Sequence, residues 1–255
     1  MAWSRFTIPF AVALAALIHI REIRVGTVIP VMLVSTLNVD RDQPGKKIEG
    51  RIMQNVPLPS GGAISERAQV FGHVVSVTKP GPSGSSMVVA FDTIQDHGRT
   101  IPITTGVLAL ASMGSVFDAG SPVSANSDMV PVTQWVTRQV GGDLVRRGWG
   151  KVESTSGVSG TWLQGSSVLI RLTPNPTAGC PGGPGYDREQ PVWVFSSAAC
   201  GVYGLGDVKI SSAGPPGQIT LSSRKKVSVR GGSGWLLIAV AESGREVEGE
   251  VPPAP

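Results

Sequence analysis

Residues 26–37 read Gly-Thr-Val-Ile-Pro-Val-Met-Leu-Val-Ser-Thr-Leu, and this stretch decides the fold class. It is rich in β-branched side chains and apolar at odd and even positions alike, which predicts a strand buried on both faces. Residues 48–56 follow a polar turn and alternate in character with period two, the pattern of a half-buried strand. No helical pattern of useful length occurs between Gly26 and Ala111. These features indicate an all-β protein.

The other apolar runs are short and separated by turns. Strands are expected at 69–78, 87–94, 99–110, 217–221, 226–230 and 235–240, with weaker candidates at 134–140, 168–172 and 192–196. Pro80–Ser86 and Gly114–Met129 are expected to be loops, and Asp96-His97-Gly98 a hairpin turn. Turns at intervals of roughly 8–12 residues predict a barrel or sandwich of about ten to twelve short strands.

The last strong run, residues 235–240, is also apolar on both of its faces. A strand of this kind at the edge of a sheet invites aggregation, so it needs paired neighbours. The strand within 28–37 offers the complementary apolar surface. We therefore expect residues 26–111 and 217–240 to share one sheet system, with residues 112–211 inserted between them.

The N-terminal residues have the pattern of an export signal. Met1–Arg5 carries one positive side chain, and Phe6–Ile20 carries no formal charge. The apolar run of about 15 residues is shorter than the roughly 20 that span a bilayer as a helix. A signal peptide is the first interpretation, and an uncleaved signal anchor in the inner membrane stays open. Either places the rest of the chain in the periplasm or outside the cell.

The predicted organisation has five parts. Residues 1–20 are a signal peptide or signal anchor, 21–111 the first part of a β-barrel, 112–211 a Gly/Pro-rich β insert that contains both cysteines, 212–241 the C-terminal strands that complete the barrel, and 242–255 a frayed tail. An even cysteine count in an exported chain favours a disulfide, here Cys180–Cys200. It would staple the insert by closing a loop of about 20 residues, worth roughly 3 kcal/mol.

One family resemblance rests on the order of motifs in the first part of the chain. Gly26–Leu33, the Gln43-Pro-Gly45 turn, Ile52–Val56, Gln69–Val74 and the hairpin that ends in Gly98–Ile103 follow a recognisable sequence. This order resembles the periplasmic β-barrel domain of the channel-forming core-complex proteins of type IV secretion and conjugation systems (TrbI-like). The match covers residues 26–111, and it implies a β-barrel of the cell envelope.

A second resemblance covers the whole chain. It rests on residues 139–145, 193–204 and 233–237, which are similar to those of a group of exported proteins of soil Acidobacteria. That group has no activity to carry over to this chain.

No catalytic, metal-binding or cofactor-binding motif occurs in the sequence. The nucleophile elbow, the P-loop and the dinucleotide-binding fingerprint are absent, and two cysteines without a paired histidine are not zinc spacing. A nucleophilic Cys200 with His73 or His97 as its base is the sharper alternative to the disulfide, and it needs these residues to converge in space. His73 is expected on a strand face and His97 in a solvent-exposed turn. The candidate acids lie mostly in predicted turns, namely Asp92, Asp96, Asp143, Asp187 and Glu189.

Composition narrows the remaining functions. The formal net charge is +4, but the basic pairs are scattered along the chain and aromatic residues are few, which argues against a nucleic-acid partner. The first hypothesis is a non-catalytic structural or interaction protein of the envelope that binds envelope proteins or itself and touches membrane only through residues 6–20. The alternatives are an exported hydrolase with an unrecognised site and an exported module for carbohydrate or another small ligand. The latter would use Trp135, Trp149, Trp162 and Trp193.

The disulfide is open to a direct test. We expect the chain recovered from envelope fractions to have the intact mass of a molecule with Cys180 and Cys200 oxidised to one another. Alkylation should add label only after reduction, because an exported dithiol of this spacing oxidises. Two alkylated thiols in exported, unreduced protein would refute the pairing.

Overall fold

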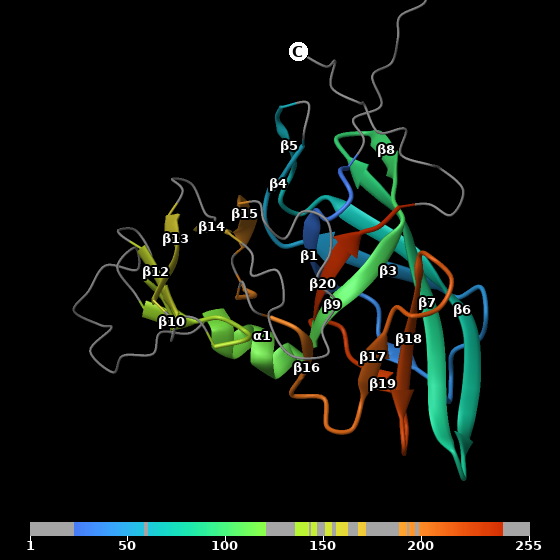
Figure 1. Cartoon of the computed structure of the whole chain (residues 1–255). Helices are drawn as coiled ribbons and strands as arrows, with labels where there is room; N and C mark the ends of the chain where they lie inside the picture. Colours follow the sequence, from blue (N-terminus) through green and yellow to red (C-terminus); the bar gives the residue numbers. More distant parts are fainter. Residues whose placement is uncertain are drawn as a thin grey trace, which may run out of the picture.

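The computed structural model describes residues 23–58, 61–120, 136–142, 144–146, 151–154, 157–162, 168–171, 189–192, 194–196 and 199–241. The fold is all-β with one short helix among these residues, as the sequence predicts (Figure 1). No described helix has the length and apolar character needed to cross a membrane. The expected leader (1–20), the tail (242–255) and Cys180 lie outside the described residues.

A ten-stranded sheet forms the body of the molecule. Its strand order is β16-β9-β20-β1-β3-β6-β7-β18-β17, with β8 paired to β7. Its strands are β1 (Val28–Leu33), β3 (Lys47–Ile52), β6 (Gln69–Gly81), β7 (Gly84–Asp96), β8 (Arg99–Pro102), β9 (Thr105–Ala111), β16 (Gly201–Tyr203), β17 (Lys209–Ser211), β18 (Gln218–Ser223) and β20 (Gly234–Ala239). The remaining elements are smaller.

A separate six-stranded sheet runs in sequence order from β10 to β15, and two short ladders join β2 with β19 and β4 with β5. Their strands are β10 (Val136–Arg138), β11 (Leu144–Arg146), β12 (Lys151–Ser154), β13 (Gly157–Trp162), β14 (Val168–Arg171), β15 (Glu189–Val192), β2 (Leu37–Asn38), β19 (Ser228–Val229), β4 (Val56–Pro57) and β5 (Ala63–Ile64). Figure 1 shows the six-stranded sheet to one side of the body, beyond α1 (Met113–Gly120).

The pairing expected between the first and last apolar strands is confirmed. β1 and β20 are antiparallel, with Val28 opposite Ile238 and Met32 opposite Gly234. β20 also pairs with β9, so the last strand lies between two strands of the N-terminal set. Because both its neighbours are present, this apolar strand has no open edge.

The large sheet curls around one core without closing into a barrel in the described residues. β16 and β17 are the ends of its strand order, and no ladder joins them. The curl still brings the ends near one another, since the Val107 amide of β9 donates to the Ser212 hydroxyl after β17 at 2.9 Å. The enclosed face carries buried side chains from nearly every strand, including Ile29, Trp235 and Phe91. The result is sandwich-like.

Several local expectations are wrong for identifiable physical reasons. Pro80–Ser86 is not a loop, because β6 and β7 continue as a hairpin to Gly81 and Gly84, with an irregular register that accommodates Pro80. Residues 99–110 form two strands, since the chain leaves β7 after Pro102 and turns to pair with β20. β16 and β17 lie within residues 112–211, the expected insert, but belong to the large sheet.

The expected loop at 114–129 begins as a helix. Ser112 caps α1: its hydroxyl accepts from the Ser115 amide at 3.1 Å, and its carbonyl accepts from the Val116 amide at 3.0 Å. Val116 then faces the sheet, since a Cβ atom on Gly234 would lie 2.8 Å from one of its methyl groups. Tertiary packing and a serine cap together explain this helix, which the sequence pattern does not predict.

Trp235 offers a test of the enclosed core. It is fully buried and meets Phe91 edge to face at 5.3 Å between ring centroids, while its indole N–H has no hydrogen-bond partner in the described structure. We expect Trp235→Ala to lower the free energy of unfolding by about 3–5 kcal/mol. Trp235→Phe should cost less than half of that, because it keeps the ring contact and removes the unpaired donor.

Chemical denaturation with a matched control measures this difference. Met32→Ala lies on the same ladder at a partly exposed position, so it should cost under about 1 kcal/mol. Equal losses in Trp235→Ala and Met32→Ala would contradict the assignment of Trp235 to a shared core.

Candidate binding surface

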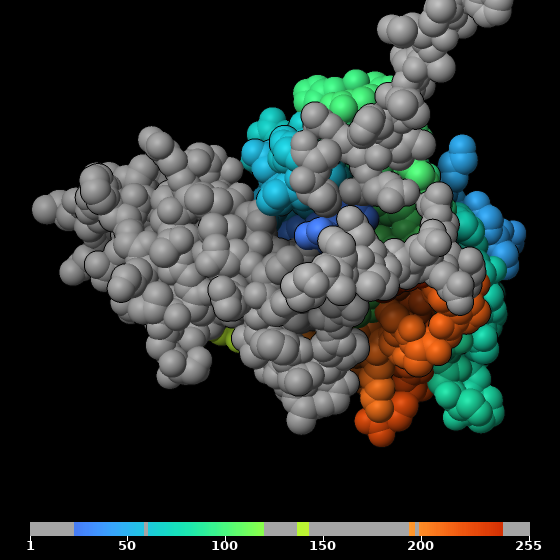
Figure 2. Space-filling model, turned by 45° about the horizontal axis from the view of Figure 1, so that its top comes forward, coloured from blue at the N-terminus to red at the C-terminus, as the bar shows by residue number. Residues whose placement is uncertain are grey.

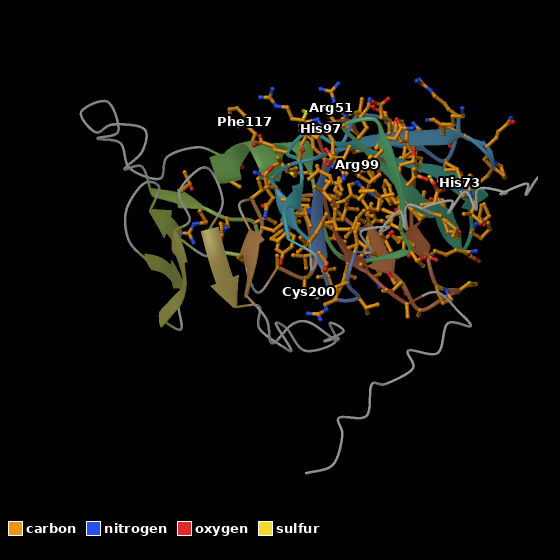
Figure 3. All side chains as sticks on the ribbon, turned by 90° about the horizontal axis from the view of Figure 1, so that it is seen from above. Arg51, His73, His97, Arg99, Phe117 and Cys200 are labelled. Atoms are coloured by element: carbon orange, nitrogen blue, oxygen red, sulfur yellow. The ribbon has the colours of Figure 1, made fainter. Side chains whose placement is uncertain are left out.

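A surface pocket of about 360 Å³ lies where β3 and β7 end and β6 begins. Its floor is a cross-strand row, in which Arg51 is opposite Gln69 and Gln69 is opposite Gln95. The turn that holds Arg67 forms one wall, and the turn between β7 and β8 that holds His97 forms another. Figure 3 shows Arg51, His97 and Arg99 on the same side of the molecule.

Backbone geometry marks the same place. Among the described residues, Arg67 (φ 71°) and His97 (φ 47°) are the two non-glycine residues with positive φ, and both line this pocket. His97 shares the two-residue turn between β7 and β8 with Gly98, as the sequence predicts. Arg67 is held because its amide donates to the Ile52 carbonyl at 2.8 Å. Left-handed conformations cost roughly 1–2 kcal/mol per residue, so tertiary structure fixes the shape of both walls.

Ser65, His97 and Asp96 meet in the pocket but do not form a catalytic relay. The Ser65 hydroxyl lies 2.8 Å from His97 Nε2, and the nearest Asp96 oxygen lies 3.7 Å from that same nitrogen. A relay needs the carboxylate on the opposite ring nitrogen, where it orients the base. The His97 side chain is also 74% exposed, as its position in a turn predicts. This trio offers hydrogen bonds to a ligand rather than an activated nucleophile.

The other predicted reactive residues are far apart. His73 lies on the outer face of β6, as expected, with its Nδ1 2.9 Å from an oxygen of Asp92. Cys200 precedes β16, where its amide donates to the Tyr203 hydroxyl and its carbonyl accepts from that hydroxyl. Figure 3 shows Cys200 well separated from both His73 and His97, so the geometry does not support a cysteine–histidine nucleophile.

The remaining predicted site residues receive little further support. The described residues include no free cysteine, but Cys180 is not among them, so its pairing with Cys200 stays a prediction. The described part of the chain has no cluster of three or more metal-ligating side chains. The side chains of the tryptophans proposed as a sugar platform lie outside the described part: Trp135, Trp149, Trp162 and Trp193.

Exposed apolar side chains gather at one place. The large hydrophobic residues that are exposed within the described structure are Met32 (36%), Val34 (44%), Met113 (50%) and Phe117 (74%). We call these four residues the apolar patch. Met32 lies in β1 and Val34 just after it, while Met113 and Phe117 lie on one face of α1, one helical turn apart. Chain segments about 80 residues apart thus supply all four.

Gly232 joins the two halves of the apolar patch. Its amide donates at 2.7 Å to the carbonyl of Leu33, which lies between Met32 and Val34 in the chain. Its φ is +84°, and a Cβ atom at this position would lie 2.9 Å from Cγ of Met113. Only glycine allows both the positive φ of this turn and the close approach of α1. The Met113 side chain therefore packs directly on the Gly232 backbone. Because Met32 is also opposite Arg51 on β3, the apolar patch continues into the floor of the pocket.

Comparison with known proteins does not assign this surface. No family model matches the chain, and no curated protein matches it.

The absence of a relay predicts how the serine behaves. We expect a fluorophosphonate probe, which labels activated serine nucleophiles, to leave Ser65 unlabelled in the folded protein. Ser65 lacks a base that is itself oriented by a carboxylate, so its hydroxyl keeps ordinary reactivity. Labelling that disappears in Ser65→Ala and in His97→Gln, but persists in His73→Gln, would show that the pocket is a hydrolase site.

Proposed function

We propose that the protein is an exported, non-catalytic interaction protein of the cell envelope and that it binds another envelope protein through the apolar patch. One observation carries the proposal: the four exposed large hydrophobic residues of the described structure lie on two segments, the end of β1 and α1, that meet at the Gly232 backbone. Isolated surface hydrophobics are ordinary, whereas contiguous ones beside polar residues mark interaction sites. Phe117 is the central anchor, since aromatic side chains supply much of the energy of protein interfaces.

The position of the apolar patch suits a preformed docking site. Met32 lies on β1, whose two neighbours β20 and β3 hold it by ladders on both sides. Met113 rests on the Gly232 backbone, and α1 begins at a capped residue. Side chains on such supports lose little freedom when a partner binds, so less of the contact energy is spent on ordering.

The flanking residues indicate the chemistry of the partner. Arg51 is beside Met32 across the ladder, and Arg67 lies further along in the pocket. A partner that places an apolar side chain against Phe117 and Met113 can direct hydrogen-bond acceptors toward these guanidinium groups. An apolar centre with a polar border is the usual composition of an interface between separate proteins.

The export component rests on the sequence. The charge-free run from Phe6 to Ile20 supports translocation, and the resemblance of residues 26–111 to the barrel domain of secretion-channel proteins supports an envelope location. We therefore place the protein in the periplasm or outside the cell, with anchorage by residues 6–20 if the leader is retained. The proposal includes no reaction and no cofactor.

Crosslinking in cells followed by reconstitution tests the proposal. We expect a photoreactive phenylalanine analogue at position 117 to give a covalent adduct with one envelope protein. The same analogue at position 73, which is on the outer face of β6 and half exposed, should give none. Phe117→Asp should then weaken binding of the purified partner at least about tenfold, equivalent to about 1.4 kcal/mol.

The variant leaves the fold intact, because the Phe117 side chain is exposed and contributes little to the core. An adduct between two copies of the chain would show that the apolar patch binds a second copy of this protein, and it would contradict the proposal of a different envelope protein as the partner. Equal adducts at positions 117 and 73, or equal affinity of Phe117→Asp and the unaltered chain, would contradict the proposal.

A further inference from the structure

Folding gathers basic residues that are scattered in the sequence. The turn at 38–46, the β6–β7 hairpin tip at 79–84 and the turn at 223–230 meet at one end of the sheet. Their cations are Arg41, Lys46, Lys79, Arg224, Lys225, Lys226 and Arg230. We call these seven residues the basic end. Figure 2 shows surfaces of all three segments on one side of the molecule.

Specific contacts join the three turns. β19 pairs with β2, and the Val39 amide donates to the Val227 carbonyl at 3.2 Å. Lys226 forms an ion pair with Asp40, while the Lys79 ammonium donates to the Asp40 carbonyl at 2.8 Å. The hairpin tip packs so tightly on the third turn that a Cβ atom on Gly84 would lie 3.0 Å from the Arg224 Cα. These contacts fix the cations relative to one another.

The carboxylates near this end leave most of the charge uncompensated. The three turns carry two, Asp40 and Asp42, against seven cations. Asp42 is buried, where it accepts from the Asn38 amide and from Lys46 at 2.7 Å each. A third carboxylate, Asp207, accepts from the Ser223 hydroxyl at 3.0 Å, and this hydrogen bond lowers the pKa of Asp207 below its ordinary value. In the described structure no carboxylate pairs with Arg41, Arg224, Lys225 or Arg230.

The excess of positive charge at the basic end is as large as the net charge of the whole chain. The three turns carry five more cations than carboxylates, and the chain as a whole has a formal net charge of +4. The rest of the sequence is therefore close to neutral, and the positive charge is concentrated at this end. Such concentration creates a local field that attracts anions and weakens as salt rises.

The shape of the basic end favours a broad anionic surface over a small ligand or a nucleic acid. The cations stand on turns, and Arg41, Lys79, Arg224, Lys225 and Arg230 are exposed. None of the three turns contains an aromatic residue, so no platform is available for stacking bases. The pocket described above is lined by none of these residues.

We propose that the basic end binds the surface of a bilayer that contains anionic phospholipid headgroups. Long basic side chains on neighbouring turns can each approach a different headgroup, and each contributes about a fivefold gain in membrane affinity near an anionic surface. The contact is peripheral and electrostatic, since the three turns hold no aromatic wedge. The basic end adjoins the apolar patch at Arg230, because the neighbouring Gly231 approaches the Val34 carbonyl, but the inference does not depend on the function proposed for the patch.

Vesicle binding by the full chain tests the inference. The measurement compares vesicles of phosphatidylcholine alone with vesicles of phosphatidylcholine and phosphatidylglycerol, so any contribution of the leader appears in both. We expect tighter binding to the anionic vesicles, and a loss of about 100-fold in that preference for the triple variant R41Q/R224Q/K225Q. These three residues are exposed and make no ion pair in the described structure, so their replacement should not unfold the protein.

The triple variant R24Q/R99Q/R138Q is the matched control. It removes the same net charge from exposed arginines elsewhere, and it should keep the preference for anionic vesicles. Equal losses in the two triple variants would show that net charge alone is responsible and would overturn the assignment. Equal binding of the unaltered chain to both kinds of vesicle would also overturn it. So would binding to duplex DNA that R41Q/R224Q/K225Q loses while vesicle binding is unchanged.

Discussion

The antiparallel ladder between β1 and β20 is the constraint on which the rest of the structure depends. These strands lie some 200 residues apart in the chain, and both are apolar on both faces. On one face Ile29, Val31 and Trp235 contribute to the core enclosed by the curled sheet. On the other face Val28 and Leu236 contribute to a second core with Phe195 and the start of the insert. This one pair of strands therefore contributes side chains to both cores.

This arrangement explains how the insert is held. Val140 forms a parallel bridge with Phe195, and both are buried in the second core against the outer face of the β9–β20–β1 strands. α1 covers the same face through Val116, and what it leaves uncovered includes Met32 and Val34. The apolar patch is thus the border of the second core, where the insert begins and the sheet comes to the surface. From the same end of β1, the chain continues through Thr36 into β2 and the turn at 38–46, which carries part of the basic end.

Much of the fold could be predicted from the sequence, because two-sided apolar strands leave few alternatives. The strands within residues 28–37 and 235–240 can bury both of their apolar faces and pair both of their edges only inside a sheet. In the structure they are neighbours in the same sheet. The turn at His97-Gly98 follows from local chemistry. The long β6–β7 hairpin does not, because its prolines suggest a loop and its pairing is irregular near Thr78. α1 depends on a cap at Ser112 and on packing against Gly234, and neither can be recognised from the spacing of apolar residues in the sequence.

The two surfaces proposed to bind partners were less accessible to prediction, because each is assembled from distant segments. Met113 and Phe117 join Met32 and Val34 only after β20 brings Gly232 to the end of β1. Lys46 and Arg224–Lys226 read as scattered pairs, and they meet because β2 pairs with β19. A positive φ at Arg67 has no sequence signal that distinguishes it from an ordinary turn residue. The sequence therefore predicts the local turns and the pairing of the two-sided apolar strands, but not the contacts between turns or between α1 and the sheet.

Native-state hydrogen exchange tests the role of the β1–β20 ladder most directly. The Leu33 amide donates to Ser233 and the Gly232 amide donates to Leu33, whereas the Val74 amide reports on the distant β6 through its bond to Lys46. If the ladder belongs to the single cooperative core, all three amides should exchange only through global unfolding, with equal free energies of exchange. Exchange of Leu33 and Gly232 at a clearly lower free energy, while Val74 stays protected, would show that the sheet persists without this ladder and would contradict its central role.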